Sequence, residues 1–488
     1  METSNIFEAK VNNQIRVIQS VYENDGVVNI ARISKDTHLD VKTVDSLWIE
    51  ILNYIENNEN LQKMDDYLSI RLRLLKDSWV YSLCENLLLG KEVSFVIFME
   101  KHYLSESKLR RKIKYINQLL EPGALRIISR KGYLSIEGKE TQIRYFAMQF
   151  FWTVFKGIKW PFEDVEFDHI LSFVKERIFN TIEFTVKDVN HVEYAYAFTI
   201  NLIRIRHGCT VSIAEIPYYS SDYVSYFKQP IYQKTKELLK THFNLSKAER
   251  HYFLLTIQTR SQYYLVEEFY DQSIRAHQQN GTDVFKLYEQ TMNYLDSKMS
   301  HPESRRFAEA IVLSAIMSAK MYDGFSRPSS GYGMKEFFEE RAPHLLLNME
   351  KLIDKITKKN QGLLMSNSKK EYLALRYAEA YSLTGNMLDF ESKILVGVIT
   401  DISFSLEELM VRKLRSRFYL IDNLEFVTLN QNEYDYFDLV IKTSITLGDI
   451  SKEGEKIVVI DPTLNKKDVE QISEMIIKIR EEKNKYLN

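Results

Sequence analysis

The chain has 488 residues, of which 45% are hydrophobic and 27% charged, a composition typical of folded globular proteins and not of disordered ones. At about 100–200 residues per domain, this length predicts several domains. The net charge of −2 excludes a strongly basic chain, and the two cysteines, Cys84 and Cys209, form no CxxC or disulfide pattern.

The first part of the chain has the pattern of a small module of helices that ends in a strand. Apolar residues at helical spacing predict three helices, at residues 10–23, 28–39 and 41–55. A period-two alternation then predicts a strand that contains Leu68, Ile70 and Leu72. A helix, a helix-turn-helix and a strand, in this order, predict a winged helix-turn-helix over residues 1–75.

A second pattern of the same kind covers residues 76–160. Its predicted helices are residues 79–89, 93–102 and 104–120. Ser105 is placed to cap the third helix, and Pro122 and Gly123 end it. Two short strands, 125–128 and 133–136, flank a basic turn and predict the hairpin wing of the module.

The rest of the chain divides into a helical part and an α/β part. Amphipathic helices predict two all-α bundles, 161–278 and 279–388, linked at 278–281, with a loop at 326–333 in the second bundle. In residues 389–488, apolar β-branched runs alternate with helices, which predicts a small open α/β sheet. The predicted fold class is therefore a multidomain, mainly α protein with two winged helix-turn-helix modules, two helical bundles and a small α/β domain.

The most informative segment is residues 104–131, which holds eight basic and two acidic residues. The apolar stripe of the predicted helix leaves its basic residues on the remaining surface, where they can contact phosphates and base edges. The candidate DNA-binding residues are Ser107, Lys108, Arg110, Arg111, Lys112, Lys114, Arg130 and Lys131. The alternative is a solvated helix face without a ligand. Residues 1–75 have eight basic and twelve acidic residues, so we expect this module to contribute less to DNA affinity.

Part of this segment resembles a known family. Ser107, Leu109, Arg111, Ile113 and Asn117, followed by the spacing Gly138-x-Glu140-x-x-Ile143-Arg144, resemble the second helix-turn-helix of the Mga/AtxA regulators of Gram-positive pathogens. The resemblance implies two DNA-binding modules, two phosphotransferase regulation domains (PRDs) and a C-terminal domain like the phosphotransferase component EIIB. It also implies double-stranded promoter DNA, a phosphotransferase phosphocarrier protein and a second copy of the chain as partners.

The same resemblance indicates a histidine as phosphate acceptor. Asn190-His191-x-x-Tyr194-Ala195 resembles the motif of the first PRD histidine, which makes His191 the main candidate and His207 a weaker one; the alternative is an ordinary histidine. Arg204 and Arg206 are potential partners of the phosphate if they lie nearby. The EIIB-like part has no cysteine after its first strand, so it is expected to serve assembly and not phosphoryl transfer.

The leading prediction is a cytoplasmic, homodimeric transcription regulator of virulence or carbohydrate-responsive genes, which we expect to act as an activator. Two alternatives remain: a phosphotransferase-responsive interaction protein or RNA-binding antiterminator that does not bind DNA, and, more remotely, an enzyme that uses the α/β domain. The chain contains no GxGxxG, Walker A, HExxH or GxSxG motif, so no enzyme and no cofactor is expected. Asp435, Asp438 and Asp461 lack the spacing of a metal site. No signal peptide or membrane span is expected.

Overall fold

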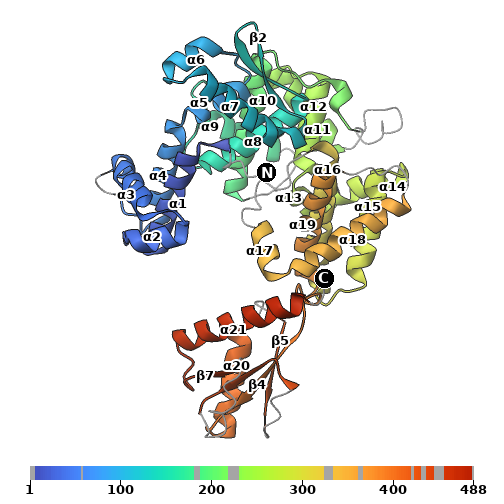
Figure 1. The fold of residues 1–488 in the computed structure, drawn as a ribbon. Coiled ribbons are helices and arrows are strands. Elements are labelled where there is room, and N and C mark those ends of the chain that lie inside the picture. The colour runs from blue at the N-terminus through green and yellow to red at the C-terminus, as the bar shows by residue number, and fades with distance from the viewer. Residues whose placement is uncertain are drawn as a thin grey trace. The chain divides into compact units, whose positions relative to one another are not determined.

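A computed structural model describes residues 6–56, 59–180, 187–217, 230–323, 334–360, 366–418, 423–429, 436–444 and 456–485. The chain forms two compact units (Figure 1). The first unit contains residues 1–292, 309–332 and 360–373, and the second contains the remainder. None of the described helices has the length and apolar character that crossing a membrane requires.

The first module of unit 1 consists of α1 (Ala9–Glu23), α2 (Ile30–Thr37), α3 (Val41–Ile51) and α4 (Met64–Asp77). Asn29 caps α2 and Asp40 caps α3, because each side chain accepts a hydrogen bond from a backbone N–H of the first turn. The helices enclose a core that includes Val17, Ile33 and Val44. The predicted helix-turn-helix is therefore present.

The strand predicted around Leu68, Ile70 and Leu72 is wrong, because these residues belong to α4. Ile70 and Leu74, one helical turn apart, enter the core of the first module. On its other side, buried Arg71 donates hydrogen bonds to the Thr153 and Val154 carbonyls of α8 (Glu140–Phe155). A helix buried on two sides has no simple apolar stripe, and its local alternation imitates a strand. Among the described residues, the first module thus has no wing.

The second module has all the elements of a winged helix. They are α5 (Trp79–Leu88), β1 (Val93–Ser94), α6 (Phe95–Lys101), α7 (Glu106–Leu120), β2 (Arg126–Arg130) and β3 (Tyr133–Glu137). The three strands form an antiparallel sheet in the order β1-β3-β2. The three helices and the hairpin occur where the sequence predicted them, except that Val93 and Ser94 pair with β3 instead of starting α6.

Helices continue through the rest of unit 1. They are α8, α9 (Phe167–Ser172), a π-helical segment (Phe173–Phe179), α10 (Asp188–Arg206), α11 (Pro230–Phe243), α12 (Lys247–Gln258), α13 (Ser261–Leu265) and α14 (Glu267–Gln279). Phe146, Phe150, Phe151 and Phe155 of α8 are all buried. The long helix α8 contacts α4, α5 and α10, so it joins the winged module to the helical part of the same unit.

Five further helices are α15 (Asp283–Asp296), α16 (Arg305–Met321), α17 (Met334–Arg341), α18 (Pro343–Lys359) and α19 (Asn367–Thr384). Gly281, with φ +56°, follows α14 at the predicted link. Helices α15, α16 and α19 each have residues in both compact units. The loop predicted at 326–333 lies outside the described residues.

The C-terminal part of unit 2 is the predicted small α/β domain. Its strands are β4 (Ile394–Ile399), β5 (Leu424–Thr428), β6 (Leu439–Lys442) and β7 (Ile457–Val459). They form a parallel sheet in the order β5-β4-β6-β7, with Val396 opposite Phe426 on one side and Leu439 on the other. Helices α20 (Phe404–Arg417) and α21 (Lys466–Lys485) pack against this sheet (Figure 1).

Candidate nucleic-acid interface

Helix α7 presents one apolar and one cationic face. The Ser105 side chain accepts a hydrogen bond from the Lys108 backbone N–H and starts the helix at Glu106. Leu109, Ile116 and Leu120 are buried. The exposed residues of α7 include the predicted Ser107, Lys108, Arg110, Arg111 and Lys114. Four of these five side chains are basic, so this face carries positive charge outward from the module.

The β2–β3 hairpin adds a second cationic element. Five residue pairs join its strands, from Arg126 opposite Glu137 to Arg130 opposite Tyr133. The connecting residues, Lys131 and Gly132, have φ values of +49° and +85°, as a tight two-residue hairpin turn requires. Arg130 and Lys131 are exposed at this tip. The hairpin therefore has the form and charge of a wing.

Asn117 ties the hairpin to α7. Its side-chain amide donates to the Ile127 carbonyl at 2.9 Å, and its side-chain oxygen accepts from the Ile127 N–H at 2.7 Å. Strand β2 is at the edge of the sheet, so these two bonds pair backbone groups that no further strand reaches. Asn117 was part of the family resemblance, but no sequence pattern indicated this role.

Three of the arginines are near carboxylates of their own module. Arg110 Nε lies 2.7 Å from Glu106 Oε1 in a pair whose side chains are both 60% exposed. Glu137 forms ion pairs with Arg130, at 2.5 Å between Oε1 and Nη2, and with Arg126, at 3.8 Å between Oε2 and Nη2. Exposed ion pairs of this kind contribute about 0–1 kcal/mol and exchange readily with other anions. Within the described part of the chain, Lys108, Arg111, Lys114 and Lys131 form no ion pair with a carboxylate.

Lys112 departs from the prediction that it projects outward. Its side chain is half-buried, and Nζ donates to the Phe7 carbonyl at 2.8 Å. The ammonium also lies 4.7 Å from the centre of the Tyr115 ring. Burial lowers the pKa of Lys112. Lys112 fastens the N-terminal segment to α7, so we do not include it in the interface.

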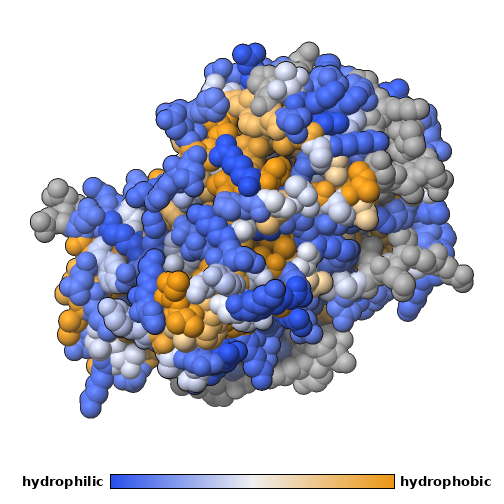
Figure 2. Space-filling model, turned by 90° about the horizontal axis from the view of Figure 1, so that it is seen from above, coloured by the Kyte–Doolittle hydropathy of each residue, from blue (hydrophilic) through white to orange (hydrophobic). Residues whose placement is uncertain are grey.

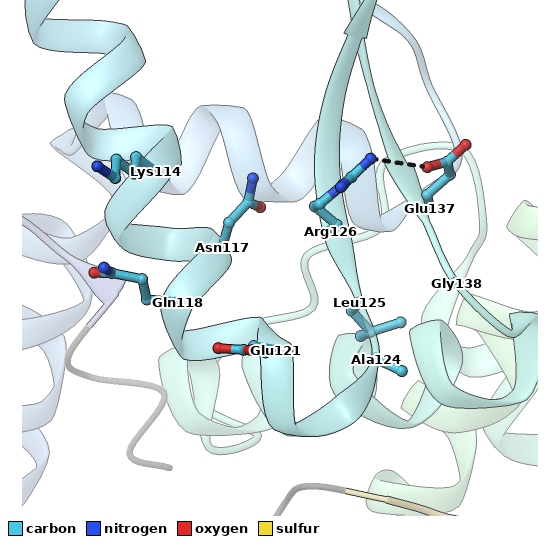
Figure 3. Close-up of a pocket in the computed structure, with 9 residues that line it drawn as sticks. All are labelled: Lys114, Asn117, Gln118, Glu121, Ala124, Leu125, Arg126, Glu137 and Gly138. Carbon is cyan, nitrogen blue, oxygen red and sulfur yellow. Dashed lines mark ion pairs between the residues drawn. The ribbon is translucent and has the colours of Figure 1, made fainter.

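An open pocket lies between α7 and the base of the hairpin (Figure 3). Its volume is about 630 Å³, and it is lined by Lys114, Asn117, Gln118, Glu121, Ala124, Leu125, Arg126, Glu137 and Gly138. Lys114 and Gln118 extend from the helix, whereas Arg126 extends from β2 next to Glu137 (Figure 3).

The face of the molecule in Figure 2 is mostly hydrophilic, with hydrophobic residues in separate patches.

His191 lies in the first turn of α10 and is 7% exposed. Its Nδ1 is 3.7 Å from Asp188 Oδ1, and its ring centre is 5.4 Å from that of Phe179. Burial and the nearby Lys175 lower the pKa of His191, although Asp188 opposes them. A neutral imidazole is the nucleophilic form of the side chain, but phosphorylation at His191 stays a prediction.

The arginines considered as partners of that phosphate lie at the opposite end of α10. Arg204 is buried, paired with Glu140 and far along α10 from His191, so the condition that it lie near that phosphate is not met. Exposed His207, the weaker acceptor candidate, has Nδ1 at 2.9 Å from the Ile203 carbonyl. His191 and His207 are therefore at the two ends of one helix and do not form a common site.

The acidic residues of the α/β domain have structural partners. Asp438 accepts hydrogen bonds from the Leu395 N–H at 2.8 Å and from Lys483 Nζ at 2.7 Å. Asp461 accepts a hydrogen bond from the Thr463 N–H at 2.8 Å. Asp435 lies outside the described residues. No group of three or more His, Cys, Asp or Glu side chains in the described part of the chain is arranged to hold a metal ion.

The second module is a winged helix-turn-helix, which is a class of DNA-binding domain. The second helix of its helix-turn-helix is cationic on the exposed face, and a basic hairpin follows this helix. Comparison with protein families agrees: residues 65–151, from α4 to α8, match the model of the Mga helix-turn-helix domain. This match supports the predicted relationship to the Mga family through the second module. A search of curated proteins found no match.

Proposed function

We propose that this protein is a transcription regulator that binds double-stranded DNA through the second module. The observation that carries the proposal is the exposed cationic face of α7 beside a basic hairpin, in the segment that matches the Mga helix-turn-helix domain. In this arrangement α7 enters the major groove, where Arg111 can pair with a guanine edge and Lys114 with a phosphate. Lys131, at the hairpin tip, reaches the neighbouring backbone or minor groove.

A binding assay with a matched control tests this proposal. We would measure fluorescence anisotropy of labelled promoter fragments with the full chain and with a triple variant, Arg111→Ala, Lys114→Ala and Lys131→Ala. Each lost phosphate contact reduces the slope of log K against log salt by about 0.9, so loss of the Lys114 and Lys131 contacts reduces it by about 1.8. Loss of the Arg111 contact with guanine lowers the affinity further. Lys112→Met is the control, since it removes a basic side chain that is bound to Phe7.

The result that contradicts the proposal is clear. If the triple variant binds promoter DNA as tightly as the unmodified chain, with the same salt dependence, the cationic face of α7 does not contact DNA. Stronger binding to RNA hairpins than to duplex DNA would instead favour the antiterminator alternative.

We further propose that phosphotransferase phosphorylation of His191 and dimerisation modulate this binding at virulence or carbohydrate-responsive promoters, without any enzymatic activity of the chain. Support for control at His191 is the motif around it. Support for dimerisation is the exposed apolar surface of α20, where Phe404, Leu406 and Leu409 are 76%, 53% and 57% exposed. Two such surfaces from two copies would bring two basic modules to one DNA duplex.

These two proposals have separate tests. In sedimentation experiments, Phe404→Asp with Leu409→Asp should shift a dimer to a monomer, whereas Glu408→Gln on the same helix should not. Incubation with the phosphocarrier protein and its phosphate donor should label the unmodified chain and not His191→Ala. An unchanged dimer, or equal labelling of His191→Ala, contradicts the corresponding proposal.

A further inference from the structure

Four buried charged side chains form a network between the winged module and the helical part of unit 1. Glu140 and Arg144 belong to α8, Arg204 to α10 and Glu249 to α12, and none is more than 8% exposed. We call these residues the charge network. Glu140 and Arg144 are also the charged members of the spacing Gly138-x-Glu140-x-x-Ile143-Arg144, for which DNA binding provides no role.

Glu140 bonds to both arginines of the charge network, and Glu249 bonds to Arg144. Glu140 Oε1 lies 2.7 Å from Arg144 Nε and 2.6 Å from Arg204 Nε, and a second bond of 2.7 Å joins its Oε2 to Arg204. Glu249 accepts two bonds from the Arg144 guanidinium, at 2.6 and 2.9 Å. Two positive and two negative charges thus neutralise one another in the protein interior.

The network reaches the winged module through the end of α5. A guanidinium nitrogen of Arg204 donates to the Leu88 carbonyl at 2.8 Å and to the Leu87 carbonyl at 3.3 Å. These carbonyls are at the C-terminal end of the helix, where the helix dipole favours a cation, and the Leu87 carbonyl also accepts the Gly90 N–H at 3.1 Å. A side chain of α10 therefore caps the first helix of the DNA-binding module.

The other end of the network holds the segment after α10. Arg144 donates to the Cys209 carbonyl at 3.0 Å, and Glu249 accepts from the Val211 N–H at 2.8 Å. Four helices and the chain that leaves α10 thus share one set of charged hydrogen bonds. A displacement of α10 would break bonds to α5 and α8 at the same time, and a displacement of α12 would break the bonds of Glu249 to Arg144 of α8.

Stability alone does not explain such a network. Burying four charges has a large desolvation cost, and well-packed apolar residues often stabilise a protein as much or more. A network of this kind instead favours one arrangement of the helices, since a shifted arrangement leaves charges buried without partners. The four charges that bear this desolvation cost lie at the contact between the winged module and α10. In the proposed function, the orientation of the winged module at this contact affects DNA binding.

We propose that the charge network is a joint that positions the winged module against α10 and α12 and thereby sets its DNA affinity. This inference rests on the proposed DNA-binding function. Arg204 is the positioning residue of the joint, because it bonds to both Glu140 and the α5 carbonyls. Its hydrogen bonds within the described part of the chain go to α5 and α8 and not to the cationic face of α7.

The test compares Arg204→Gln with Arg206→Gln in the full chain. Arg206 is on the same helix, but its side chain is exposed and forms no ion pair among the described residues. Arg204→Gln should weaken binding to promoter fragments by fivefold or more, the range of coupling between distinct sites, with an unchanged salt slope because no phosphate contact is lost. Arg206→Gln should bind with unchanged affinity. Stoichiometric titration gives the fraction of active protein and separates affinity from misfolding.

Hydrogen–deuterium exchange provides a readout that does not depend on DNA. Arg204→Gln should accelerate exchange in residues 86–91, at the end of α5, and Arg206→Gln should not. If Arg204→Gln fails to fold, Glu140→Gln serves instead, with the same expected results, because Glu140 holds Arg204 against α5 by two hydrogen bonds. If a folded variant keeps both the affinity and the exchange pattern of the unmodified chain, the joint is refuted. If the unmodified chain binds no DNA, the proposed function fails, and the exchange experiment still decides whether the network holds the module.

Discussion

Asn117 offers the sharpest test of how the wing is held. Asn117→Ala removes two hydrogen bonds to the Ile127 backbone, of 2.9 and 2.7 Å. It leaves an N–H and a carbonyl at the edge of β2 without their partner, beside the buried Ile127 side chain. A lost hydrogen bond of this type costs about 1 kcal/mol, so we expect local opening of the hairpin to become easier by about 2 kcal/mol.

Hydrogen–deuterium exchange of the full chain measures this local effect without requiring two-state unfolding of a multidomain protein. A decrease of about 2 kcal/mol in opening free energy corresponds to exchange about thirtyfold faster. The effect should appear in peptides that cover residues 125–137 and be absent from peptides of α1 and α2. DNA affinity should fall as well, because the wing samples open positions.

Gln118→Ala is the matched control for this experiment. Gln118 is the next residue of α7 and lines the same pocket (Figure 3), but it is exposed and forms no side-chain hydrogen bond to β2 among the residues that the structure describes. If Asn117→Ala and Gln118→Ala give the same exchange in residues 125–137, the two bonds do not hold the hairpin. Faster exchange throughout unit 1 would equally refute a local role.

Three further predictions follow from single side chains. Gly138→Ala should destabilise the base of the hairpin by about 2 kcal/mol, because φ of Gly138 is +148° and a Cβ there would overlap Leu125 Cδ2. A denaturant titration monitored by hydrogen–deuterium exchange measures this, and equal stability of the two proteins would refute it. Glu137→Gln should strengthen DNA binding several-fold and steepen its salt dependence, because Arg126 and Arg130 lose their carboxylate partner; weaker binding would refute this. Burial lowers the pKa of His277 to about 4, so the unfolded chain, with a pKa near 6.5, takes up a proton first as the pH falls. Stability should therefore decrease from pH 6.5 to 4, by up to about 3 kcal/mol, and His277→Gln should reduce the slope of melting temperature against pH; an unchanged slope would refute this.

The second module was predictable because its sequence signals are local. Ser105 is a cap, Pro122 and Gly123 interrupt the helix, and a two-residue turn with Gly132 connects two short strands. Each of these depends on neighbouring residues alone. The same reasoning placed the strands of the α/β domain, since buried parallel strands are short apolar runs.

The failures of prediction all involve contacts between segments far apart in sequence. Leu68, Ile70 and Leu72 alternate, but α4 is buried on two sides and hides its helical period. Lys112 belongs to a basic run, yet the Phe7 carbonyl, 105 residues away, binds it. Arg204 was a potential partner of phosphate if it lay near His191, and it lies instead 2.6 Å from Glu140. Periodicity and charge counts contain no information on such pairings.

The shared helix α4 has a consequence for the DNA that this protein can recognise. Its apolar side chains complete the core of the first module, while Arg71 bonds to the end of α8 behind the second. The two helix-turn-helix elements therefore cannot swivel independently on a flexible tether. An operator that engages both must present its two contact regions at one fixed spacing and rotation, and inserting half a helical turn of base pairs between them would remove one contact region from reach.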